Sequence, residues 1–330
     1  MDQPSVRHSV WLVFFLLLNL VPVTSFAGQA SEPGADWLAI QQASDGRITT
    51  DTTRATSIQA TSEAVLALTG QVPQPVLAQA LDYLNQADAD TSTENLARRL
   101  LASRVLGTTE NAALQTLLQR HKRFAGFAPF PGYDSDVLSS AFALQALAAH
   151  GIVDERSGST LQFLLSRQQA DGGWGPGDNL SQVQTTALAM HAIWQYRRHY
   201  AVGSALTSAQ DYLLASRDTD HLWGDDERSS LALIALLEGM LDRTPLLASV
   251  AALRERQSSA GDIGLDAYLT ALALRVFALS AQPNADETRL FGRIQDESSG
   301  QGLPGVEITL SGAGSASAAT DAEGRFLIND

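Results

Sequence analysis

The chain has 330 residues, of which 45% are hydrophobic, so it can bury the core of one large domain or of two smaller ones. Its net charge of −14 and its lack of a basic cluster argue against binding to nucleic acid or to anionic lipid, because both kinds of binding need Lys and Arg beside phosphates. The absence of cysteine excludes disulfides, thiolate nucleophiles and cysteine-ligated metals. We predict no metal site and no cofactor.

The N-terminus has the pattern of an export signal. Arg7 precedes an apolar run over residues 10–21, and small residues precede a cleavage position after Ala27. The run is shorter than the ~20 residues that cross a bilayer. We therefore predict a secretory signal peptide over 1–27 and a linker over 28–35. The mature protein would be exported to the periplasm, the cell surface or the medium, without a membrane span.

Residues 36–282 repeat a pair of helices about every 40 to 50 residues, a period typical of solenoids and closed arrays. In each of six units the second helix is more apolar than the first, which suits an inner position. Such hairpins can stack as an open solenoid or close into a ring, and the alternation of apolar and amphipathic helices favours the ring. In the third unit one helical face carries Val137, Ala141, Leu144 and Ala148.

The fourth unit contains the clearest motif, an aliphatic residue followed by Gln, Gly and Trp at fixed spacing. Its residues are Leu164, Gln168, Gly172 and Trp174. The motif resembles the QW repeat of the squalene cyclase and protein prenyltransferase superfamily, which implies an all-α fold, an α/α toroid. We expect the glutamine to tie the outer helix to the backbone of the next one, the glycine to permit a tight turn and the tryptophan to pack over it. Partial copies are Trp37 with Gln41, Gly126 with Phe127, and Leu222 to Gly224.

The family chemistries can be tested against the residues. Prenyltransferase zinc sites and thioester domains both need a cysteine, so neither fits. Class II terpene cyclases protonate their substrate with the middle acid of a DxDD motif and typically use two helical domains. Here Asp134 and Asp136 match two of these acids, but Val137 replaces the last one. The alternative role for Asp136 is an N-cap, the usual role of an aspartate just before a helix.

One acid stands near the start of each predicted inner helix. Carboxylates there are favoured by the helix dipole, by roughly 0.3–1 kcal/mol each. In a closed ring they would converge on the end where the inner helices begin, which we call the mouth, and could bind a cationic or polyhydroxylated ligand there. The alternative is six capping residues and no ligand. The acids are Asp51, Glu94, Asp136, Asp178, Asp226 and Asp266.

Two tryptophans and a histidine complete the candidates. Trp174 and Trp223 follow successive turns and either pack locally or form a stacking platform for a sugar or an isoprenoid at the mouth. His191 has no acid or second histidine at i+4, so we interpret it as a packed, hydrogen-bonded residue.

After a linker over 283–288 the pattern changes to short alternating runs separated by Gly, Ser and Asp. Residues 289–330 are similar to the start of a carboxypeptidase regulatory-like β-sandwich, on the segments 303–310 and 320–326. About 40 residues are too few to close a sandwich. We therefore predict a truncated β-sandwich segment, a last strand with an unpaired edge and further modules beyond Asp330.

These observations support a first hypothesis of an exported, non-catalytic toroid that binds an unidentified ligand or protein partner at its mouth, or serves as a scaffold. The alternative is a terpene-cyclase-like enzyme with Asp136 as general acid, accompanied by Asp134. A third hypothesis is a carbohydrate-active toroid that uses paired acids at the mouth. The character of the central cavity discriminates between them.

Overall fold

The computed structural model describes residues 32–86, 92–108, 110–123, 125–177, 180–240, 242–282, 289–294, 296, 301–311, 315–321 and 325–329. The predicted signal peptide, both predicted linkers apart from residues 32–35, and Asp178 lie outside these residues.

Six helices form an inner ring within the described part of the chain. They are α2 (Ser57–Leu68), α4 (Thr93–Val105), α6 (Val137–Ala149), α8 (Val183–Trp194), α10 (Asp226–Gly239) and α12 (Ala267–Ala281). Each inner helix packs against the next one, and α12 packs against α2, so the ring closes. The predicted all-α toroid of six helical hairpins is confirmed, and the open solenoid is excluded.

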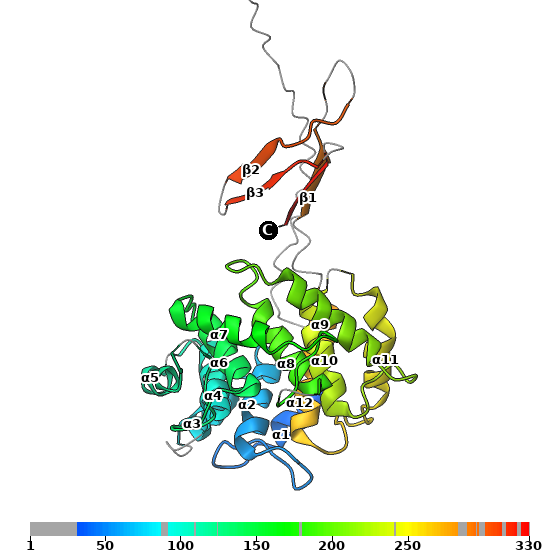
Figure 1. The fold of residues 1–330 in the computed structure, drawn as a ribbon. Helices are drawn as coiled ribbons and strands as arrows, with labels where there is room; N and C mark the ends of the chain where they lie inside the picture. The colour runs from blue at the N-terminus through cyan, green and yellow to red at the C-terminus, as the bar shows by residue number, and fades with distance from the viewer. Residues whose placement is uncertain are drawn as a thin grey trace, which may run out of the picture. The chain divides into compact units, whose positions relative to one another are not determined.

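The other six α-helices lie outside this ring, each packed against one or two of the inner helices (Figure 1). They are α1 (Pro33–Ile40), α3 (Gln74–Gln86), α5 (Asn111–Gln119), α7 (Glu155–Ser166), α9 (Gly203–Ala215) and α11 (Leu247–Glu255), the last preceded by a 3₁₀ turn, η1 (Thr244–Leu246). Each outer helix precedes an inner helix in the chain, so the hairpins run outer first, as the repeat pattern predicts.

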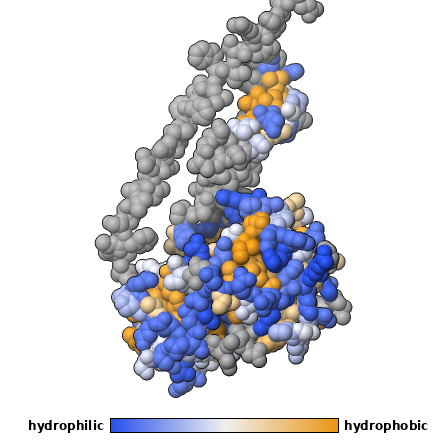
Figure 2. All heavy atoms as spheres, turned by 90° about the vertical axis from the view of Figure 1, so that its left-hand side faces the viewer, coloured by the Kyte–Doolittle hydropathy of each residue, from blue (hydrophilic) through white to orange (hydrophobic). Residues whose placement is uncertain are grey.

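The difference between inner and outer helices follows from their composition. In α6, 10 of 13 residues are buried, because alanine and leucine occupy most of its faces. In α7 only 4 of 12 residues are buried, on one stripe, and the remaining positions are mostly polar. Figure 2 shows a mostly hydrophilic outer face of the ring, broken by small hydrophobic areas.

The C-terminal residues form two antiparallel strand pairs. The first joins β1 (Arg289–Arg293) to β4 (Arg325–Asn329), and the second joins β2 (Glu307–Ser311) to β3 (Ser315–Ala319). Hydrogen bonds between the backbones of Gly305, Val306 and Thr320 extend the second pair. The strands were predicted, and β4 pairs with β1 along one edge, while the described residues form no ladder on its other edge. A complete β-sandwich is not formed by the described residues.

The turn that links an outer helix to its inner helix, which we call the joint, has a recurring hydrogen-bond pattern. In the fourth hairpin Gln168 Nε2 donates to the carbonyl oxygens of Gly172 and Ala205, both at 2.9 Å, and so ties α7 to α9. The Trp174 ring is buried, and its Nε1 donates to the Leu164 carbonyl at 2.7 Å. The glutamine therefore does what the sequence predicts.

The same joint occurs in hairpins that lack the tryptophan. In the first hairpin Gln42 donates to the Gly46 carbonyl and to the Val76 carbonyl on α3, whereas Gln41 donates only to Trp37. The assignment of the motif to Trp37 and Gln41 was therefore wrong by one residue. In each of five joints an apolar residue donates its backbone N–H to a hydroxyl on the following inner helix: Ile48 to Thr61, Phe127 to Ser140, Trp174 to Thr186, Trp223 to Ser229, and Ile263 to Thr270.

Glycine is required at the joint for two reasons. Gly172 has φ +89°, and a Cβ there would overlap the carbonyl oxygen of Ser208 on α9. Gly46 stands in the same position against the backbone of α3, with φ +91°. Glycine at the joint therefore allows two outer helices to approach each other more closely than any other residue would.

We expect Gly172→Ala to destabilise the ring more than Gly151→Ala. Gly151 has φ +69° with open space around it, so alanine there costs about 1–2 kcal/mol of left-handed strain. Alanine at Gly172 adds overpacking against Ser208, typically about 1–3 kcal/mol more. Urea unfolding of both variants measures the difference, and equal losses would show that the close approach at the joint has no energetic weight.

Candidate functional site

Three charged residues on three of the inner helices meet at the centre of the ring. Glu63 of α2 accepts hydrogen bonds from Nη1 of Arg98 on α4 and from Nη1 of Arg275 on α12, both at 2.6 Å. The side chains of Glu63 and Arg98 are 7% and 5% exposed, and that of Arg275 is 19% exposed. Charges are buried in proteins only when they are paired, and here one carboxylate joins two guanidinium groups.

Arg98 is held on all sides. Its Nε donates to Glu94 at 2.8 Å, its guanidinium lies 4.7 Å from the centre of the Phe142 ring, and Tyr268 Oη lies 3.5 Å from its Nη2. Glu94, Arg98, Glu63 and Arg275 thus form a chain of alternating charges with no net charge. We call these four residues the central ion network.

The two arginines decide the protonation state of Glu63. Burial alone would raise the pKa of its carboxyl, but the attraction and the hydrogen bonds of Arg275 and Arg98 outweigh burial and lower it below the usual 4.5. Glu63 is therefore ionised at neutral pH.

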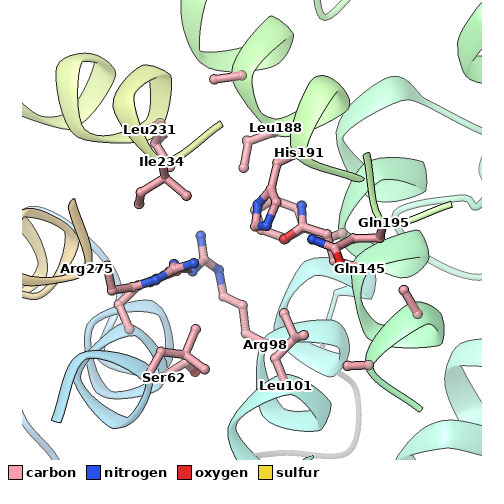
Figure 3. Close-up of a pocket in the computed structure, with 16 residues that line it drawn as sticks. Ser62, Arg98, Leu101, Gln145, Leu188, His191, Gln195, Leu231, Ile234 and Arg275 are labelled. Atoms are coloured by element: carbon pink, nitrogen blue, oxygen red, sulfur yellow. Dashed lines mark hydrogen bonds and ion pairs between the residues drawn. The ribbon is translucent and has the colours of Figure 1, made fainter. Parts of the chain in front are cut away.

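Glu63, Arg98 and Arg275 of the central ion network form one side of a cavity of about 220 Å³ that is lined by residues from all six inner helices. Figure 3 shows the guanidinium groups of Arg98 and Arg275 on one side of it and His191, Gln145 and Gln195 on the other. The apolar wall includes Leu66, Leu101, Leu188, Leu231 and Ile234. The lining runs from the middle of the inner helices, at residues such as Ser62, Leu188 and Leu231, to Ala148 and Ala149 in the last turn of α6, so the cavity extends from the middle of the ring toward the end where the inner helices end.

The polar lining differs in how well its hydrogen bonds are satisfied. His191 Nε2 lies 3.0 Å from Glu238 Oε2 on α10, and Gln195 Nε2 donates to the same oxygen at 3.3 Å. Burial would raise the pKa of Glu238, but His191 lowers it. In contrast, Gln145 Nε2 is buried without a partner. His191 is hydrogen-bonded, as the sequence predicts, but its partner comes from the neighbouring helix.

Asp134 and Asp136 lie away from this cavity. Asp136 is the N-cap of α6, and its two carboxylate oxygens accept from the backbone N–H and the hydroxyl of Ser139, both at 2.7 Å. Asp134 is exposed. Neither residue lines the cavity among the described residues.

The remaining predicted acids have separate local roles. Asp266 caps α12 and also accepts from the Arg54 backbone, and Glu94 belongs to the central ion network. Asp226 is the first residue of α10, whose N-cap is Asp225 and not Asp226. Asp51 is exposed in a turn five residues before the N-cap Thr56.

The inner helices begin at the same end of the ring, because residues at the starts of neighbours touch. Gln59 donates to Glu94 at 2.7 Å, and Gln184 donates to Glu227 at 3.0 Å. The residues that line the cavity stand more than one turn after the starts of the inner helices, and none of the predicted acids within the described residues is among them. The sequence-based expectation that the chemistry would lie at the acidic starts of the inner helices is not met by this cavity.

Both candidate tryptophans are buried, with Trp174 0% and Trp223 2% exposed. Their Nε1 atoms donate to the carbonyls of Leu164 and Leu213, on the preceding outer helices. Neither ring lines the cavity, so neither offers a face for stacking there.

Sequence reasoning missed the residues of the central ion network other than Glu94, and it missed Gln145. A signal was present for two of them, because Glu63 and Arg275 are the only charges within the apolar segments 57–68 and 267–281, whereas Arg98 lies in a segment with three other charges. Such charges must be paired or solvated, and the pairing partners lie up to 212 residues apart.

Within the described residues the protein has neither a cluster of metal-ligating side chains nor a membrane-spanning helix. No group of three or more His, Asp or Glu side chains is placed to hold a metal ion. No described helix is both long and apolar enough to cross a membrane.

No protein family model and no curated protein matches the sequence. Solved structures do match. The ent-copalyl diphosphate synthase of Streptomyces platensis is 20% identical, with a TM-score of 0.55 over 68% of this chain and half of its own. A protein from Actinoplanes is 15% identical, with a TM-score of 0.61 over 76% of this chain and 98% of its own. The type II terpene cyclase MstE from Scytonema is 15% identical, with a TM-score of 0.59 over 75% of this chain and 96% of its own.

These likenesses show the fold, an α/α toroid that type II terpene cyclases share. They also correct one sequence-based argument. Because 96% of MstE aligns to three quarters of this chain, a terpene cyclase does not need two helical domains. The single ring of this chain is therefore no argument against cyclase activity, and the decision rests on the residues of the cavity.

The pKa of a second glutamate, Glu227, is shifted in the opposite direction to that of Glu63. Glu227 lies in the first turn of α10 and is half-buried. Burial and the neighbouring charge of Asp225 raise its pKa above 4.5. Ionisation of Glu227 therefore disfavours the folded state, whereas ionisation of Glu63 favours it.

We expect Glu63→Gln and Glu227→Gln to change stability in opposite directions near pH 7. Glu63→Gln leaves two arginines without their shared partner and should cost about 3–5 kcal/mol. Glu227→Gln keeps an acceptor for Gln184 and removes an unfavourable charge, so it should stabilise the folded state. The Glu227 difference should vanish below pH 4.5, where this carboxyl is protonated in both the folded and the unfolded state, whereas the Glu63 difference should persist there and disappear only as the pH falls through the lowered pKa of Glu63. Urea unfolding across this range tests the signs, and a stabilising Glu63→Gln would contradict the assignment of Glu63 as ionised.

Proposed function

We propose that the helical ring is a non-catalytic binding module whose central cavity takes a small, largely apolar molecule. The observation that carries this proposal is the protonation state of Glu63, whose carboxyl lines the cavity. Among the described lining residues Glu63 is the only acid, and it is clamped in its ionised form by Arg98 and Arg275.

Cyclisation by a type II terpene cyclase starts with a proton donated to the substrate, which needs a protonated acid in contact with it. Glu63 has a lowered pKa and holds two guanidinium groups, so it has no proton to give. Asp136 is occupied in capping α6, and Glu227, whose pKa is raised, does not line the cavity. None of these acids is placed to start a cyclisation in the cavity.

The size of the cavity supports the same proposal. MstE has been solved with geranylgeranyl dihydroxybenzoate, which contains a twenty-carbon chain. A protein cavity of about 150 Å³ binds one benzene molecule, which is about 25 Å³ for each carbon, so on this scale such a chain needs about 500 Å³. This cavity offers about 220 Å³. It suits a ligand of roughly seven to ten non-hydrogen atoms on the same scale.

We further propose that the ring works outside the cytoplasm, beside a β module. The charged, apolar and small-residue pattern of residues 1–27 supports export. The alternating pattern of residues 289–330 and the two strand pairs β1–β4 and β2–β3 support a carboxypeptidase regulatory-like module at the C-terminal side. The ring would then be one binding unit of a larger exported protein.

We expect the protein to bind 1-octanol in the cavity and Ala149→Trp to abolish this binding. Ala149 is half-buried in the last turn of α6 and lines the cavity, so an indole there fills the space without disturbing a packed core. Calorimetry or ligand-observed NMR should show at least about a tenfold loss of affinity. Ala252→Trp, at a half-buried position of α11 outside the cavity, is the matched control. Undiminished binding by Ala149→Trp would place the ligand elsewhere.

We also expect no cyclised product when the purified protein is incubated with geranylgeranyl dihydroxybenzoate or other polyprenyl substrates, because no protonated acid lines the cavity. Product analysis by mass spectrometry, with MstE as positive control, measures this. Turnover by the wild-type chain that Asp136→Asn abolishes would replace the binding module with the cyclase.

A further inference from the structure

This inference rests on the proposed function and names the ligand class. We propose that the cavity selects a small monocarboxylic acid, whose carboxylate is bound by Arg275 and Gln145 and whose apolar tail lies against the leucines of the wall.

Arg275 offers an unused pair of donors. Its Nη1 is bound to Glu63, but no hydrogen bond within the described residues involves its Nε or Nη2. These two N–H groups form one edge of the planar guanidinium and point in parallel, the geometry that binds a carboxylate with two hydrogen bonds. The side chain lines the cavity and is 19% exposed, so this charge is reachable from the cavity.

Gln145 provides the second, independent observation. It lines the same cavity, is only 8% exposed, and its Nε2 has no hydrogen-bond partner. Buried donors without acceptors are rare and costly. The terminal amide can rotate about its last torsion, so its N–H groups can turn toward the cavity. A ligand oxygen there would supply the acceptor that the protein lacks.

The other charges of the site favour an anion over a cation. Both oxygens of Glu63 already accept from arginine, and one oxygen of Glu238 is bound by His191 and Gln195. Glu238 is not among the lining residues. The unsatisfied groups that face the cavity from Arg275 and Gln145 are donors, so a ligand must bring acceptors to satisfy them.

The cavity also limits the kind of anion. The three nitrogens of Arg98 are hydrogen-bonded to Glu94, Glu63 and Tyr268. Among the described lining residues, Arg275 is therefore the one arginine with an edge of its guanidinium that makes no hydrogen bond. A single free edge matches the two oxygens of one carboxylate, whereas a phosphate dianion calls for more than one cation. Leu101, Leu188 and Leu231, from three different helices, provide an apolar surface for a short chain or a ring.

The experiment compares ligands with one eight-carbon tail and different head groups, with the full chain at about pH 7, where the carboxylic acid is ionised. Octanoate should bind about 10- to 100-fold more tightly than 1-octanol, because hydrogen bonds to a charged group are the stronger ones. Octylamine and octyl phosphate should bind more weakly than octanoate. Tighter binding of either one would overturn the proposal.

Two variants test the named residues. Gln145→Leu removes the amide at nearly constant size, so octanoate affinity should fall about tenfold while octanol affinity stays or rises. Its thermal stability should not fall, since a buried unsatisfied donor is lost. Arg275→Lys keeps a cation beside Glu63 but loses the planar edge, and it should abolish the preference for octanoate over octanol. Gln71→Leu, a half-buried glutamine outside the cavity, is the matched control.

The outcomes separate this inference from the proposed function. If octanol and octanoate bind equally to the wild type, or Gln145→Leu and Arg275→Lys retain the octanoate preference, the carboxylate site is refuted and the binding module stands. If no ligand of the series binds in a way that Ala149→Trp blocks, both proposals fail together.

Discussion

The ring depends on one carboxylate held by two guanidinium groups. Glu63 stands on the first inner helix, Arg98 on the second and Arg275 on the last, so the two contacts of Glu63 connect the beginning of the ring to its end. None of the three charges can be buried without the others, because an isolated ion in an apolar interior costs several kcal/mol. In this array of helices the buried charges are therefore all paired only when the ring closes.

The same interaction determines what the interior of the ring can do. An apolar, aromatic chamber with a protonated acid would suit the cyclisation of a long hydrocarbon. Here the centre holds an ion network without net charge, and Glu63, the one carboxyl among the described lining residues, is ionised. The fold is shared with type II terpene cyclases, but this cavity is small and has charged and polar side chains on two of its sides. The likeness of the fold therefore has to be separated from the chemistry of the cavity.

Much of the fold could be predicted from the sequence because its signals are local. The apolar period of helices such as α6 and the Gln-Gly-Trp spacing of the fourth joint are both contained within a few turns of chain. Prediction failed at the first joint, where two adjacent glutamines, Gln41 and Gln42, could both fill the motif position. Contact with α3 decides between them, because Gln42 donates to the Val76 carbonyl and Gln41 does not. The acids before the inner helices were found, but Asp136 is occupied as a cap, because aspartate there satisfies the free N–H groups of the first turn.

By itself the sequence determined six helical hairpins, their inner and outer members and the residues of the fourth joint, because helical periodicity and turn chemistry act between residues close in the chain. Only the tertiary structure decided which charges meet and which side chains enclose a cavity. Glu63 and Arg275 are 212 residues apart, and His191 finds Glu238 on the next helix. Such pairs depend on the orientation of each helix about its own axis and on its packing in the ring. The sequence pattern of a single helix does not specify this orientation relative to the other helices.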